Sequence, residues 1–155
     1  MSNLYTNAEI KAIGITFNSY DERYIDVVND GTIERRYIKP ILNDFYTLFV
    51  ADQTPFTLIK EDIKQAVAFL VIEKAIARNG KSKTQNLGEL TNFTNKSKQA
   101  TAEDVNIKRD EFYTDAVMLL LDVAKELIAN PTDYTGFNEA KAVLEVSFRS
   151  TTGLV

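Results

Sequence analysis

Apolar residues recur at helical spacing over most of the chain, so the sequence predicts a mainly α-helical fold. The densest stretch follows the turn signal Asp30-Gly31, and its apolar positions are four residues apart: Ile33, Tyr37, Ile41, Phe45 and Phe49, widened by Ile38, Leu42 and Leu48. Pro40 lies inside this pattern and predicts either a kink or a junction just before it. We expect the rings of this stretch to lie in the core.

Two capping-box patterns predict short helices near the start of the chain. Thr6 and Glu9 precede a helix over 7–13, which Gly14 ends. Ser19 and Glu22 repeat the pattern and open a second helix, whose apolar side is formed by Tyr24, Ile25, Val27 and Val28.

Two longer helices are predicted over 57–78 and 102–129. The first is apolar around most of its circumference from 66 to 72, which is typical of a helix that is central or covered by a neighbouring subunit. Asn79-Gly80 is expected to end it. The second has a core stripe and stops at Asn130-Pro131; the stripe is Val105, Phe112, Ala116, Leu119, Leu120, Val123, Leu127 and Ile128.

The periodicity changes in two places. Residues 80–100 are polar, and Leu87-Gly88-Glu89-Leu90 predicts the turn of a β-hairpin near 81–98. In 142–149 apolar and polar residues alternate, which favours a strand, although 138–141 could hold a helical turn.

The predicted fold is therefore a small bundle of about four to five helices. It comprises a helical domain over 1–137 with the hairpin inserted at 81–98, followed by an extended or strand-like C-terminal arm over 138–155. A fifth helix, or a strand folded back on its own hairpin, stays open as an alternative for that arm.

Composition excludes much of enzyme chemistry. The chain has no Cys and no His, which removes thiolate nucleophiles, sulfur-ligated metals and the usual general base. No catalytic, cofactor-binding or metal-binding residue set is predicted. A loose resemblance of Pro131, Asp133, Glu139 and Lys141 to Mg²⁺ nuclease sites is too short in spacing to count as one. No apolar run approaches the ~20 residues that span a bilayer, and the first residues lack the features of a signal peptide, so we expect synthesis in the cytoplasm and no membrane partner.

Charge is distributed unevenly along the chain. Residues 78–98 carry five basic side chains against one Glu and have a net charge of +4, whereas the whole chain has −4. One interpretation of this charge is a solvated loop. The other is a basic arm that binds an acidic surface, either another copy of the protein or nucleic acid, and the acidic remainder makes protein the better fit. The residues predicted to contact other subunits are Lys81, Lys83, Leu87, Leu90, Phe93, Lys96 and Lys98, with Leu144, Val146 and Phe148 from the arm.

The order of these features resembles a known family. The segments 33–46 (IERRYIKPILNDFY), 97–105 (SKQATAEDV) and 130–134 (NPTDY), with the long helices around them, resemble the neck adaptor, or head–tail connector, proteins of tailed bacteriophages, especially crAss-like and related Bacteroidetes phages. The resemblance covers roughly 5–137. Asn43 stands where the family usually has a small residue, and the last 18 residues show no family pattern.

The resemblance implies a structural virion protein at the head–tail junction and no enzyme. Such proteins form a ring, usually of twelve copies, below the portal protein, and further neck or tail proteins dock on it. Packaged DNA passes through the channel without sequence-specific binding. Another oligomeric phage structural protein, a small DNA-binding regulator and a carboxylate-based metal enzyme are the alternatives that the sequence leaves open.

We expect no nuclease, NTPase or hydrolase activity, because no base, nucleophile or phosphate-binding loop is present in the sequence. Assays with Mg²⁺ on DNA, nucleotides and ester substrates check this. Turnover that requires Mg²⁺ and disappears on substitution of Asp133 or Glu139 would contradict the expectation.

Overall fold

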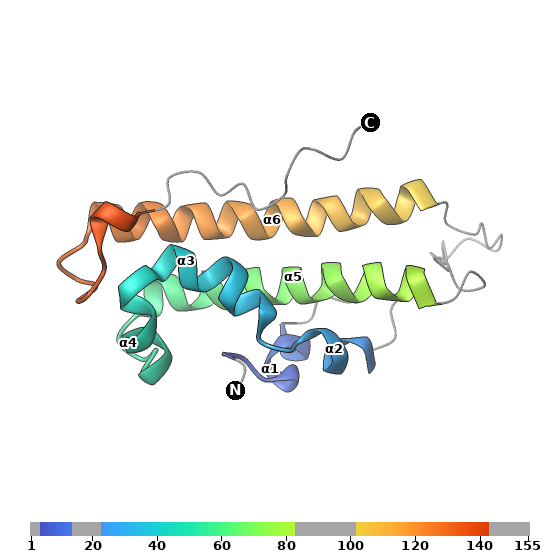
Figure 1. Cartoon of the computed structure of the whole chain (residues 1–155), viewed down its shortest axis with the longest axis horizontal. Coiled ribbons are helices and arrows are strands. Elements are labelled where there is room, and N and C mark those ends of the chain that lie inside the picture. Colours follow the sequence, from blue (N-terminus) through green and yellow to red (C-terminus); the bar gives the residue numbers. More distant parts are fainter. Residues whose placement is uncertain (1–3, 14–22, 83–101, 143–155) are drawn as a thin grey trace.

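The computed structural model describes residues 4–13, 23–82 and 102–142, and these residues form a helical bundle along one long antiparallel pair (Figure 1). The pair is α5 (Thr57–Ser82) and α6 (Ala102–Ala129). Beside it lie α1 (Asn7–Ala12), α2 (Arg23–Val28), α3 (Lys39–Leu42) and α4 (Tyr46–Ala51). The described residues contain no strand, so the mainly helical fold is confirmed for them.

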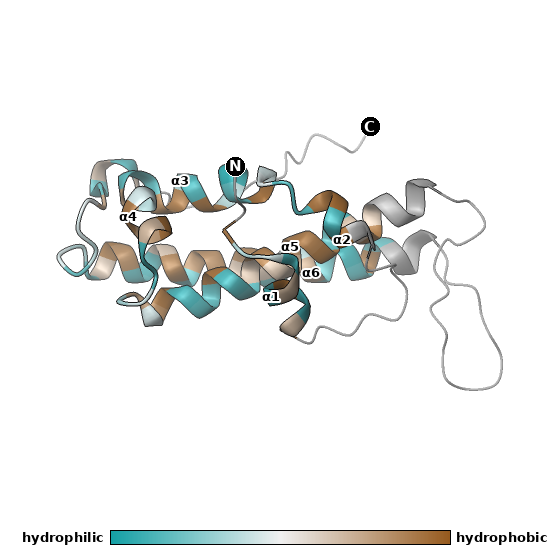
Figure 2. Ribbon diagram, turned by 90° about the horizontal axis from the view of Figure 1, so that it is seen from below, coloured by the Kyte–Doolittle hydropathy of each residue, from teal (hydrophilic) through white to brown (hydrophobic). Residues whose placement is uncertain are grey.

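α5 is the central element, as its sequence requires. It packs on α6, α2 and α1, and every side chain from Ala66 to Ile72 is buried except that of Phe69, which is half-buried. Figure 2 shows apolar and polar segments along both long helices, as expected for helices with a buried and an exposed side. A helix that is apolar nearly all round needs neighbours on several sides, and here α1, α2 and α6 of the same chain supply them.

The predicted N-terminal capping box is confirmed. The Thr6 hydroxyl accepts a hydrogen bond from the Glu9 backbone N–H at 3.2 Å, and the Glu9 carboxylate accepts one from the Thr6 N–H at 2.8 Å. The helix that follows ends at Ala12 and buries Ile10. After α2, the turn predicted at Asp30-Gly31 is present, and Gly31 has φ 76°, a value that suits glycine.

The chain widens into a π-helical turn just before Pro40. Glu34–Ile38 form this turn (η1), and the Lys39 N–H donates to the carbonyl of Glu34, five residues back. In a regular α-helix the Pro40 ring would clash with the carbonyl of Arg36, to which it has no N–H to offer. The wider turn avoids this clash, and Pro40 falls in the first turn of α3, so the predicted junction before Pro40 is confirmed.

The apolar stripe with four-residue spacing is buried as predicted, from Ile33 through to Phe49. Leu48 was expected to widen it, and this is wrong, because the Leu48 side chain is 44% exposed. A 3₁₀ turn, η2 (Asn43–Phe45), precedes α4 and fixes its phase so that Phe49 points inward. Leu48 is about 100° around the helix from Phe49 and therefore faces solvent.

The predicted end of α5 is also wrong. The helix continues past Asn79-Gly80 to Ser82, so residues 81 and 82, expected to begin the hairpin, are helical. A glycine in a helix costs only about 1 kcal/mol relative to alanine, so the Asn-Gly signal is not decisive. The rest of the predicted hairpin, 83–98, lies outside the described residues.

α6 has the bounds that its sequence predicts, and most of its stripe is in the core. Ala116, Leu120, Val123 and Leu127 are buried, and the other members with described side chains are half-buried: Phe112, Leu119 and Ile128. The helical turn allowed for 138–141 is present as a 3₁₀ turn, η3 (Glu139–Lys141). Residues 143–149 of the predicted strand lie outside the described residues.

Truncating the Phe45 side chain tests the aromatic core. Its ring is fully buried and meets Phe56 at 4.8 Å and Phe49 at 6.0 Å between centroids. We expect Phe45→Ala to lower the free energy of unfolding by about 3–5 kcal/mol, measured by urea denaturation. Leu58→Ala is the control, because Leu58 is 74% exposed, and it should change stability by about 0.5 kcal/mol or less. Equal losses in the two variants would contradict this assignment of the core.

Candidate functional site

Most of the contact residues predicted from the sequence cannot be placed. Lys81 lies in the last turn of α5. The others lie outside the described residues: Lys83, Leu87, Leu90, Phe93, Lys96, Lys98, Leu144, Val146 and Phe148. What the structure does describe is the point from which each of these two segments leaves the bundle.

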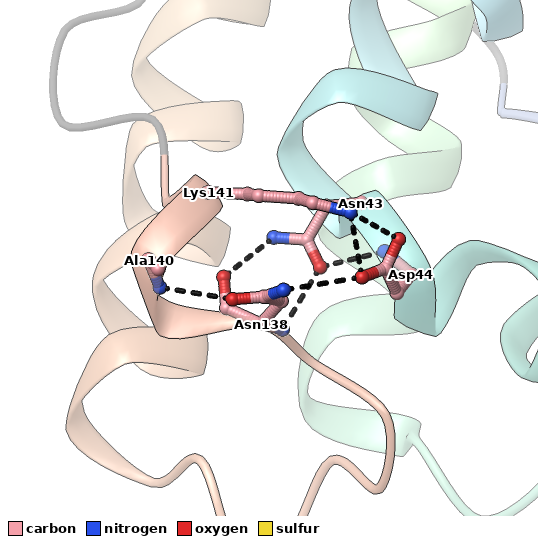
Figure 3. A network of polar contacts seen from close by, with 5 residues as sticks. All are labelled: Asn43, Asp44, Asn138, Ala140 and Lys141. Carbon is pink, nitrogen blue, oxygen red and sulfur yellow. Dashed lines mark hydrogen bonds and ion pairs between the residues drawn. The ribbon is translucent and has the colours of Figure 1, made fainter.

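The C-terminal segment leaves through a polar clamp, formed by Asn43, Asp44, Asn138 and Lys141 (Figure 3). The Asn43 side chain binds both backbone groups of Asn138: its amide nitrogen donates to the Asn138 carbonyl at 3.1 Å, and its oxygen accepts from the Asn138 N–H at 3.0 Å. This is the pairing that a neighbouring strand residue would give. One asparagine side chain therefore joins positions 95 residues apart in the chain.

Asp44 and Lys141 add an ion pair to the clamp. The Lys141 ammonium lies 2.9 Å and 2.8 Å from the two carboxylate oxygens of Asp44, and the Asn138 amide donates to the same carboxylate at 3.3 Å. These contacts hold the pKa of Asp44 below its usual value, and the contact with Lys141 contributes most. Because the carboxylate is exposed, the pair defines geometry more than it adds stability.

The backbone of Asn43 has an unusual conformation. Its φ of 44° and ψ of −123° fall in a region that favours glycine and that side chains tolerate poorly. The Asn43 side-chain oxygen also accepts a hydrogen bond from the Asp44 N–H at 2.6 Å. The side chain therefore stabilises the turn in which its own backbone is strained. Strain of this kind persists where surrounding contacts hold it, and here the contacts are those of the clamp.

Beneath the clamp lies an aromatic cluster. The buried Tyr134 ring meets Phe45 edge-on at 5.6 Å and lies 6.1 Å from Phe56. Its hydroxyl donates to Glu126 at 3.1 Å, and burial, followed by this carboxylate, raises the pKa of Tyr134 to about 12. Tyr134 thus anchors the loop after α6 to the core, and the loop delivers Asn138 to Asn43.

The second feature is the side of α6 that faces away from α5. Ile107 and Met118 are 51% and 54% exposed there. Helical spacing places four polar residues beside them, and five of the six line one shallow surface depression. We call this set the outer strip of α6: Ile107, Asp110, Glu111, Thr114, Asp115 and Met118. Its exposed apolar residues were not predicted from the sequence, because they lie outside the core stripe.

Two partly buried contacts of carboxylates hold the bundle together around these two features. Arg109 donates to the largely buried Glu73 at 2.8 Å and so ties α6 to α5. Glu34 is 2% exposed and accepts a hydrogen bond from the Leu4 N–H at 3.2 Å, which holds the N-terminal segment. Within 4–13, 23–82 and 102–142, no three Asp or Glu side chains cluster as metal ligands would, and no helix is long and apolar enough to cross a bilayer.

Comparison with known proteins adds no assignment. The chain matches no protein-family model, no curated protein and no solved structure. The function is therefore argued from the residues, the bundle and its two exposed features.

The clamp predicts a specific titration behaviour. The Asp44 carboxyl should titrate below the usual value of about 3.9, and Lys141→Gln should raise its pKa. Because the folded-state pKa is lowered, the contact stabilises the fold above the unfolded-state pKa and is lost as the pH falls through the folded-state value. Carbon-13 NMR of the Asp44 carboxyl measures this.

Lys125→Gln is the matched control. Lys125 pairs with Asp122 at 3.0 Å on α6, outside the clamp, so this substitution removes an exposed ion pair of the same type. It should leave the Asp44 titration unchanged. An Asp44 pKa that does not respond to Lys141→Gln would show that the Asp44–Lys141 ion pair does not form in solution.

Proposed function

We propose that this chain is a structural subunit of a tailed-bacteriophage neck. In this proposal, copies of the chain form a ring, of about twelve by the resemblance stated above, between the portal protein and further neck or tail proteins. Packaged DNA passes through the ring without sequence-specific binding. The protein acts by assembly, with no catalytic step and no cofactor, and its place is the head–tail junction of the virion.

One observation supports this proposal most: the two segments with predicted intersubunit contacts leave the bundle from opposite ends. α5 ends and α6 begins at one end of the long pair, whereas η3 lies at the other (Figure 1). The 28 residues of α6 span about 42 Å. A subunit that presents different contact segments at two separated ends can bind like copies head to tail, which is how rings form.

We also place the partner of the C-terminal arm outside its own chain. The strand predicted over 142–149 would extend about 26 Å. Its backbone N–H and C=O groups still need partners. The β-hairpin over 83–98 and the strand over 142–149 remain part of the proposal, with Leu144, Val146 and Phe148 as the side chains that contact the neighbouring subunit.

The clamp suits such an arm. Asn43 binds the backbone of Asn138, and the N-cap contact from Ala140 N–H to the Asn138 side chain at 3.1 Å starts η3. These bonds fix where the arm begins. An arm whose first residues are held loses less conformational freedom when it binds a neighbour, so it binds more tightly.

Assembly of the purified protein tests the proposal. We expect the full chain to form a closed ring that native mass spectrometry counts and negative-stain electron microscopy images. A chain truncated after Ala142 keeps the clamp and should fold as a helical monomer that forms no ring, because it lacks the arm.

The control is a full-length chain with Thr151→Ala and Thr152→Ala, which alters the tail without removing its apolar residues. It should assemble like the unaltered protein. A full chain that stays monomeric at every concentration would overturn the ring, and normal assembly of the truncated chain would overturn the role of the arm.

A further inference from the structure

α6 buries one side within the described chain and exposes apolar residues on the opposite side. Its core stripe packs on α5 and α3. The outer strip is on the opposite side, where Ile107 and Met118 expose half of their surface. Singly exposed apolar residues are common on protein surfaces, so the feature that distinguishes this side of α6 is their combination with the carboxylates between them.

The polar residues of the outer strip give it a charge. Asp110, Glu111 and Asp115 lie between the two apolar side chains along the helix, and Lys108 pairs with Glu111 at 2.5 Å. Arg109 binds Glu73 of α5. The strip thus has three carboxylates between an exposed apolar residue at each end, and a complementary partner would be basic and partly apolar.

We propose that the outer strip of α6 binds residues 83–98 of a second copy of this chain. That segment supplies Lys83, Lys96 and Lys98 against the carboxylates, and it supplies large apolar side chains that cover Ile107 and Met118: Leu87, Leu90 and Phe93. The inference rests on the proposed function, since it names the surface through which neighbouring subunits meet. The complementary charges also guide the encounter of two copies.

A second copy fits better than the same chain. Residues 83–101 join the end of α5 to the start of α6, and Met118 lies about 24 Å along α6 from Ala102. A path out to Met118 and back uses about 48 Å, and full extension of these 19 residues gives about 63 Å. The chain length that is left must also cross α6 from the α5 side, where the helix is about 10 Å wide, and must form a turn. The same segment of a neighbouring copy has no such limit, because it does not have to return to α6 of this chain.

The C-terminal residues 143–155 fit the outer strip of α6 less well than residues 83–98 do. Their charged side chains are one Glu and one Arg, which cancel, so they offer nothing to the carboxylates of the strip. Residues 83–98 have a net charge of +2 and match it in both charge and apolar content.

Charge reversal on each side, followed by mixing, tests the proposal. The strip variant carries Asp110→Lys, Glu111→Lys and Asp115→Lys, and the segment variant carries Lys83→Glu, Lys96→Glu and Lys98→Glu. The control variant makes the same charge change elsewhere, on exposed acids outside the strip: Glu61→Lys, Asp133→Lys and Glu139→Lys. Circular dichroism and urea denaturation confirm that each variant is folded, and sedimentation velocity measures association.

We expect each of the strip and segment variants to associate at least tenfold more weakly than the unaltered protein, and the control to associate normally. An equimolar mixture of the two should recover association, because the strip of each variant then meets an opposite charge on the other. Failure of the mixture to recover would show that the strip and the segment do not meet between copies, and unchanged association of the strip variant would leave the strip without this role. Either result overturns the inference.

A direct binding measurement separates this inference from the proposed ring. A fluorescent peptide of residues 83–98 should bind the full chain and bind the strip variant at least tenfold more weakly, as measured by anisotropy. A protein that forms no ring but binds the peptide at the strip contradicts the proposed function alone. A ring-forming protein that does not bind the peptide, or binds it equally in the strip variant, contradicts the inference alone.

Discussion

The burial of α5 is the constraint on which the rest of the fold depends. A helix whose middle third is apolar on all sides cannot be stable next to water on any of them. α6 covers one side, and α1 and α2 cover others. The short helices are too short to be stable by themselves, so their stability comes from this packing. The capping box of α1 and the contact between Glu34 and Leu4 hold the N-terminal segment in place, and the π turn before Pro40 leads into α3, which packs on α6.

Much of the fold could be predicted from the sequence, because the residue patterns that define these helices are local. The Thr6–Glu9 capping box, the stripe from Ile33 to Phe49 and the bounds of α6 follow from spacing and from residues that favour helix ends. The errors arose where a local signal competed with its context. Asn79-Gly80 normally ends a helix, yet α5 runs on to Ser82. Leu48 fits the apolar pattern, yet the 3₁₀ turn before α4 rotates it outward.

The candidate site was less predictable for a different reason. The clamp joins Asn43 to Asn138 and Asp44 to Lys141 across more than 90 residues, and no periodicity links such positions. The φ of Asn43 is positive, a conformation that glycine adopts most easily, and asparagine in its place adds a side chain that binds the backbone of Asn138. The outer strip could have been found by looking for apolar residues of α6 that lie outside its core stripe.

The antiparallel pair also acts as a spacer between the two ends of the subunit. The separation of the ends is set by the number of residues in α5 and α6, at about 1.5 Å each. An insertion in one helix alone would shift its core stripe against its partner. Matched insertions of about two turns in both helices would preserve the packing and move the ends apart by about 10 Å. The length of such a subunit can therefore change during evolution only in steps shared by both helices, whereas the sequences of the segments at its ends are free to change with the partners they meet.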